Sequence, residues 1–102
     1  MTHIFDLDGT VLKFHTNEWL PGAKEMLESC VLQGDLILFI TARGIQDRNT
    51  EWSIEKTEEL LKGLNLPYRI VYGVESPRIL YDDDFGSISA LHPRDGAWKW
   101  KE

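Results

Sequence analysis

Short apolar runs and amphipathic segments alternate along this chain. Residues 2–5 and 36–41 are rich in β-branched and aromatic side chains, which predicts two buried strands. Between them, apolar residues recur every three or four positions, which predicts an amphipathic helix. Pro21 suits its first turn and Gly34 suits its end. The second run is continuously apolar, as is typical of a parallel strand covered on both faces.

A second helix and a third strand follow. Asn49 or Thr50 can cap a helix that runs to about Lys62, with its apolar positions on one side. Residues 68–73 are a less uniformly apolar run, which predicts a third strand nearer the edge of the sheet. The repeated strand–helix–strand order predicts right-handed crossovers, and therefore an α/β fold with a mainly parallel sheet.

The next segment predicts a brief fourth strand. Residues 79–81 are apolar and lead into three consecutive aspartates at 82–84. The link from 74 to 78 is too short for a helical crossover, which usually needs about a dozen residues. We therefore expect the link to cross one face of the sheet in extended form.

Composition limits the class of protein. A chain of 102 residues predicts a single domain, 1–102, and its 42% hydrophobic and 27% charged residues are ordinary for a globular protein. The net charge of −6 argues against a polyanion-binding surface. One cysteine, Cys30, favours a reducing compartment. No apolar run approaches the length of a membrane span, and the first strand begins too early for a signal peptide, so we expect a cytoplasmic protein without membrane contact.

The candidate chemistry lies where the predicted strands end. Asp6 and Asp8 follow the first strand, Thr41 ends the second, and Asp82 and Asp83 follow the fourth. The carboxyl ends of parallel strands are where open α/β sheets bind ligands, so we expect these side chains to converge. Neighbouring carboxylates repel one another unless a cation intervenes. An all-oxygen site of this kind predicts Mg²⁺ as the cofactor.

These motifs together resemble a known family. The pattern D-x-D-G-T at 6–10, an apolar strand ending in Thr41, and an apolar strand ending in Asp82-Asp83 occur in the order found in haloacid-dehalogenase-like phosphatases. The segment 39–43 and the short link before the fourth strand are most similar to small, capless members associated with capsule and surface-sugar biosynthesis. The resemblance implies a three-layer Rossmann-like domain with no cap domain.

The resemblance also implies roles for individual residues. Asp6 would be the nucleophile that forms an aspartyl-phosphate, and Asp8 would be the general acid and base. Asp6, the backbone carbonyl of Asp8, and the Asp82-Asp83 pair would hold Mg²⁺. Thr41 and backbone N–H groups of the turn ending at Thr10 would bind phosphoryl oxygens, with Thr10 bracing the turn rather than reacting. The implied activity is phosphomonoester hydrolysis.

One expected residue is missing. Members of the family carry a lysine near the nucleophile, and the matching position here is Val74. Arg78 and Arg43 are the candidates to replace it in binding the substrate phosphate, although arginine and lysine differ in geometry. The absence of that lysine leaves an alternative function open: a catalytically weak relative that binds Mg²⁺ and a phosphorylated ligand without efficient turnover.

The absence of an expected cap domain indicates which partners the site could bind. An open site suits a phosphorylated small molecule or a phosphorylated macromolecule. Such a small, aromatic-rich domain could also form a homo-oligomer, and Trp98 and Trp100 could cover a sheet edge or join a subunit contact.

Overall fold

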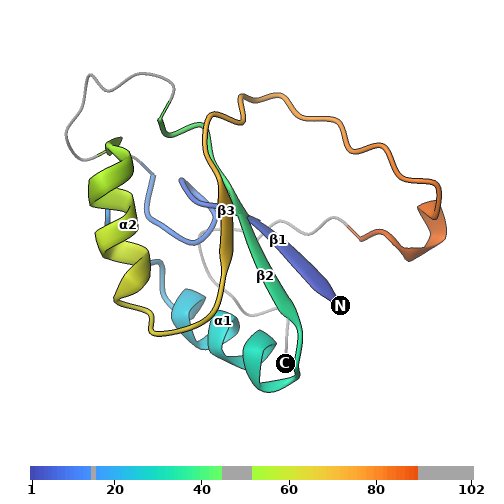
Figure 1. Cartoon of the computed structure of the whole chain (residues 1–102), viewed down its shortest axis with the longest axis horizontal. Coiled ribbons are helices and arrows are strands. Elements are labelled where there is room, and N and C mark those ends of the chain that lie inside the picture. Colours follow the sequence, from blue (N-terminus) through green and yellow to red (C-terminus); the bar gives the residue numbers. More distant parts are fainter. Residues whose placement is uncertain (15, 45–51, 90–102) are drawn as a thin grey trace.

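The computed structural model describes residues 1–14, 16–44 and 52–89, and these form a small α/β domain. Their elements, in chain order, are β1 (Thr2–Asp6), α1 (Ala23–Leu32), β2 (Leu36–Ile40), α2 (Ile54–Lys62), β3 (Arg69–Val71) and the 3₁₀ turn η2 (Phe85–Ser87). Figure 1 shows the strands side by side, with the two helices beside the sheet. The predicted positions of Trp98 and Trp100 lie outside the described residues.

The described sheet is parallel and has the order β1-β2-β3. Phe5 pairs with Phe39 in register, and Phe39 pairs in turn with Ile70. Each strand-to-strand connection passes through a helix, as the sequence predicts for α/β units. The carboxyl ends of all three strands therefore lie at one edge of the sheet.

The core lies between the helices and one face of the sheet. Alternate residues of β2, Ile37 and Phe39, are buried there with Phe5 of β1. The helices contribute apolar residues to the same cluster, among them Leu27 and Leu61. The other face of β2 is less covered, and Leu36 is 63% exposed. The prediction that both faces of this strand are covered was therefore only half right.

The helix boundaries correct the sequence prediction in two places. α1 begins at Ala23, because Gly22 adopts a left-handed conformation (φ 83°) that separates Pro21 from the helix. α2 is capped by Ser53, whose Oγ accepts a hydrogen bond from the Lys56 backbone N–H at 3.1 Å. A serine three residues before that N–H satisfies an end-of-helix donor directly. The expected cap at Asn49 or Thr50, which lie outside the described residues, is therefore wrong.

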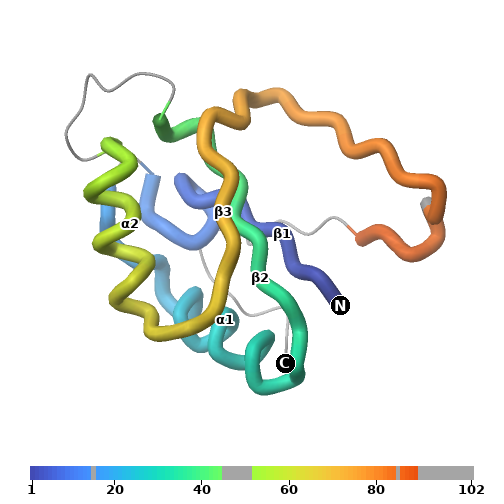
Figure 2. Tube along the Cα trace, in the orientation of Figure 1, coloured from blue at the N-terminus to red at the C-terminus, as the bar shows by residue number. Residues whose placement is uncertain are grey.

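The predicted fourth strand does not form. Residues 75–84 have no ladder to the sheet in the described chain, and Ile79, Leu80 and Tyr81 are 76%, 60% and 86% exposed. Figure 2 shows this extended segment, in orange, leaving the end of β3 and passing well apart from β1. Three consecutive apolar residues form a strand only where the edge of a sheet is available for pairing. In this structure the segment lies apart from the edge of β1.

None of the described helices has the length and apolar character needed to cross a membrane.

Candidate functional site

The turn after β1 places two aspartates beyond the end of the strand. Leu7 is fully buried, and its carbonyl accepts hydrogen bonds from the N–H groups of Thr10, Val11 and Leu12 at 3.2, 3.1 and 2.9 Å. Gly9 has φ 82°, a left-handed conformation that glycine adopts without strain. This compact turn fixes Asp6 and Asp8 at the carboxyl edge of the sheet, as predicted, and Thr10 braces it through its backbone.

Asp6 is paired with Arg78. Arg78 Nη1 donates to Asp6 Oδ1 at 3.1 Å, and its Nη2 donates to the Val74 carbonyl at 2.8 Å. Both side chains are partly exposed, 30% for Asp6 and 26% for Arg78. Burial raises the pKa of the Asp6 carboxyl above its usual value, the Asp8 charge adds to this, and Arg78 opposes it. The sequence has no lysine at position 74, but the structure places the guanidinium of Arg78 beside Asp6.

Asp8 is held by a buried arginine. Both of its carboxylate oxygens accept hydrogen bonds from Arg43, at 2.7 Å from Nη2 and 3.1 Å from Nε. Arg43 is fully buried, and the Asp8 side chain is 12% exposed. A two-bonded pair of this kind has a fixed geometry and is stronger than a neutral hydrogen bond. Asp8 therefore has a defined orientation, turned toward Arg43.

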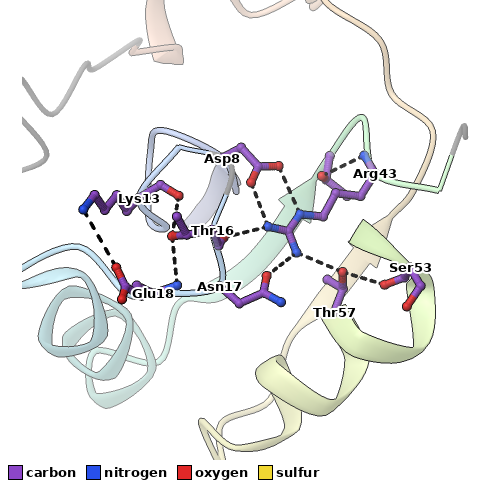
Figure 3. A network of polar contacts seen from close by, with 9 residues as sticks. Asp8, Lys13, Thr16, Asn17, Glu18, Arg43, Ser53 and Thr57 are labelled. Atoms are coloured by element: carbon purple, nitrogen blue, oxygen red, sulfur yellow. Dashed lines mark hydrogen bonds and ion pairs between the residues drawn. The ribbon is translucent and has the colours of Figure 1, made fainter. Parts of the chain in front are cut away.

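The remaining donors of Arg43 bind three other groups. Nη1 donates to Asn17 Oδ1 at 2.7 Å and to Thr57 Oγ1 at 3.1 Å, while Nη2 also donates to the Thr16 carbonyl at 3.0 Å (Figure 3). The guanidinium also lies 5.7 Å from the centre of the Trp52 ring. Arg43 thus joins the loop after β1, the end of β2 and α2. Its burial and these partners make it a structural centre, so we do not retain it as a phosphate-binding replacement for the missing lysine.

Thr41 lies at the end of β2, in the predicted place. Its Oγ1 accepts a hydrogen bond from the Arg43 backbone N–H at 3.1 Å, and the residue is buried. An acceptor hydroxyl keeps its own hydrogen for donation to another oxygen. Donation to a phosphoryl oxygen therefore remains a prediction for Thr41.

Asp82 and Asp83 are not brought to Asp6 and Asp8. Both are exposed, and Asp82 Oδ1 accepts a hydrogen bond from the Asp84 N–H at 2.8 Å instead. Across the described residues, no three His, Cys, Asp or Glu side chains come together in a way that could hold a metal ion. The expected convergence of these four aspartates is therefore wrong for a single chain. The described residues do not assemble a donor set for Mg²⁺, and the cofactor stays a prediction.

Three residues of this site were not anticipated from the sequence. Asn17, Ser53 and Thr57 take part in the polar network around Arg43, directly or through Thr57 Oγ1, which donates to the Ser53 carbonyl at 2.9 Å. Asn17 comes from the loop after β1, whereas Ser53 and Thr57 lie at the start of α2, and the three carry no common motif, so only the folded chain could identify them.

Comparison of the chain with protein-family models, with curated proteins and with solved structures gave no match.

Proposed function

We propose that this protein is a phosphomonoester hydrolase of the haloacid-dehalogenase-like type, built as a capless Rossmann-like domain and acting in the cytoplasm. The observation that carries the proposal is the Asp6–Arg78 pair at the carboxyl edge of the sheet. A partly exposed carboxylate beside a cation suits attack on a phosphate dianion, because the cation offsets the repulsion between the two anions.

The proposed first step uses Asp6 as the nucleophile. A carboxylate oxygen of Asp6 attacks phosphorus, the bond from phosphorus to the ester oxygen breaks, and the alcohol leaves with a proton. Arg78 stays close to the developing charge, since the Val74 carbonyl holds its other amino group. Water then cleaves the aspartyl-phosphate to give inorganic phosphate and free Asp6. Mg²⁺ is the cofactor we expect, although no three potential ligand side chains come together in the described part of the chain to hold it.

Asp8 is the proposed source of the leaving-group proton. Each Asp8 oxygen already accepts a hydrogen bond from Arg43, so only the remaining lone pairs of these oxygens are open to a substrate. This contact favours a second candidate function, in which the protein binds a phosphorylated ligand and turns it over poorly. In that case the Arg43 pair holds Asp8 out of the reaction.

A phosphatase assay tests both candidates. We would use p-nitrophenyl phosphate, sugar phosphates and nucleotides with Mg²⁺, and a phosphorylated protein as a macromolecular substrate. Asp6→Asn should lower kcat by at least about 10³-fold, since it removes the nucleophile itself. Asp35→Asn, the same change at the opposite end of the sheet, is the matched control and should retain activity. An inactive wild-type protein that binds these phosphates saturably would reject hydrolysis and favour the binding function.

A further inference from the structure

The guanidinium of Arg43 is held from several directions at once. Nε and Nη2 donate to Asp8, Nη2 also donates to the Thr16 carbonyl, and Nη1 donates to Asn17 and Thr57. An arginine side chain carries five N–H groups in one plane, and these five hydrogen bonds are enough to engage all of them. Because the side chain is fully buried, turning that plane would separate buried donors from their acceptors.

Thr57 differs from the other described acceptors in its place in the fold. The others all belong to the segment that follows β1, so their bonds fix the guanidinium relative to that segment alone. Thr57 lies on α2, one turn after the Ser53 cap (Figure 3). Its bond therefore ties the far end of the Arg43 side chain, and Asp8 with it, to a helix.

The hydroxyl of Thr57 has a fixed direction of its own. Oγ1 donates to the Ser53 carbonyl at 2.9 Å and accepts from Arg43 Nη1 at 3.1 Å. A hydroxyl has one hydrogen to donate, and the bond to Ser53 uses it, so a lone pair faces Arg43. Thr57 is fully buried, which keeps both bonds in the interior. The first turn of α2 thus presents an acceptor to the guanidinium in one orientation.

We propose that Thr57 is a positioning residue for Asp8. Its hydroxyl fixes the plane of the Arg43 guanidinium, and the two bonds from Arg43 then fix the direction of the Asp8 carboxylate. A bidentate pair sets the angle between its two partners but can turn as a unit, and the bond to α2 removes that freedom. The catalytic part of this inference rests on the proposed hydrolase function, in which the orientation sets the direction from which Asp8 protonates the leaving oxygen.

Nuclear magnetic resonance of the Arg43 side chain tests the anchoring without any use of activity. In the wild type, the Arg43 Nε–H proton should exchange slowly with solvent, because it is held in a bond to Asp8. Thr57→Val removes the hydroxyl but keeps the shape of the side chain. We expect it to speed that exchange by about tenfold or more relative to the backbone N–H of Phe39, in the central strand. Thr57→Ser keeps the hydroxyl and should leave the exchange rate unchanged.

Two results of this experiment would overturn the proposal. In the wild type, an Arg43 Nε–H that exchanges as fast as that of the exposed Arg69 would show that the guanidinium is not held, and this result needs no variant to fold. Equal exchange rates in Thr57→Val and Thr57→Ser would show that α2 does not fix it. Faster exchange in the valine variant alone supports the anchoring.

The dependence on the leaving group tests the effect on Asp8. p-Nitrophenolate leaves as a stable anion, whereas an alkyl alkoxide must receive a proton as it leaves, so only the second needs a well-placed acid. We expect Thr57→Val to lower kcat/KM for glycerol phosphate by about tenfold or more and for p-nitrophenyl phosphate by less than about threefold. Because kcat/KM covers the steps up to loss of the alcohol, the later hydrolysis of the aspartyl-phosphate does not enter the comparison. Thr57→Ser should restore both values.

Thr2→Val, the same change at the exposed start of β1, is the matched control and should leave both values unchanged. Equal losses of both activities in Thr57→Val would show a general structural effect and reject the positioning role. An active wild type that Thr57→Val does not alter rejects that role as well and leaves the hydrolase standing. An inactive wild type whose Arg43 signal still responds to Thr57→Val rejects the hydrolase and leaves the anchoring of Asp8 standing.

Discussion

The two ends of the sheet treat their acidic residues in opposite ways. At the amino end, Asp35 lies 2.9 Å from His3 Nε2 and 3.0 Å from the amino group of Met1, and the hydrogen bond from His3 is the main reason that its pKa is lowered. At the carboxyl end, burial raises the pKa of Asp6 in spite of Arg78. The contacts at the amino end therefore favour the charged form of Asp35, whereas burial at the carboxyl end disfavours the charged form of Asp6. Acids held against their preferred state are found more often at functional sites than in supporting structure.

The carboxyl end itself contains two arrangements. Both oxygens of Asp8 are bonded to a buried arginine, whereas Asp6 is bonded to a partly exposed one. The first arrangement fixes the turn and α2 in place, and the second leaves an accessible carboxylate on that fixed support. The difference separates Arg43, which supports the turn and α2, from Arg78, which lies beside the more accessible carboxylate of Asp6.

Replacing Arg43 should have the largest effect on stability. Arg43→Met leaves Asp8 without its partner and removes donors from Asn17 and Thr57. Breaking one side of a buried ion pair typically costs about 3–5 kcal/mol, so we expect a fall of that size in the free energy of unfolding, measured in urea. Arg78→Met, at a partly exposed pair, is the control and should cost no more than about 1 kcal/mol. Equal losses of unfolding free energy for the two variants would show that Arg43 and Arg78 do not differ in their contribution to stability.

Replacing Arg78 should lower activity strongly while changing stability little. Arg78→Met removes the cation beside Asp6, and loss of one such charge-stabilising group typically lowers kcat by about 100-fold. Arg78→Lys keeps the charge and should recover part of that loss. The measurement is the steady-state kcat of both variants, after the melting temperature of each has been compared with that of the wild type. A Lys variant no better than the Met variant would show that charge at this position is not what matters.

The raised pKa of Asp6 predicts that its charged carboxylate lowers the stability of the fold near neutral pH. An acid whose pKa is raised on folding contributes stability below its unfolded pKa, and that contribution is lost as the pH rises through the folded value. Asp6→Asn should therefore raise the melting temperature by a few degrees near neutral pH. The difference from wild type should shrink as acid protonates Asp6. Calorimetry in EDTA at several pH values measures this, and a lower melting temperature for Asp6→Asn near neutral pH would contradict it.

Local sequence patterns predicted the parts of this fold that depend on local structure. The apolar run at 36–41 forms a strand that ends one residue earlier, the helical periodicity before it forms a helix that begins at Ala23, and the D-x-D-G-T segment forms the expected turn. The fourth strand failed because a strand depends on a distant edge, and the contact of Arg78 with Asp6 directs the chain away from it. The burial of Arg43 could not be predicted from local sequence, because it depends on partners from the loop after β1 and from α2, and charged residues are rarely fully buried unless paired.

The smallest effect is expected at the amino end of the sheet. A lowered pKa means that Asp35 contributes stability above its unfolded pKa, and that this contribution is lost as the pH falls through the folded value. Asp35→Asn should therefore lower the melting temperature slightly near neutral pH, opposite in sign to Asp6→Asn, and the difference should fade in strong acid. His3→Gln removes the main partner and should have a similar, non-additive effect, because both changes break one hydrogen bond. If Asp6→Asn and Asp35→Asn shifted the melting temperature in the same direction, the two ends of the sheet would not differ as their contacts indicate.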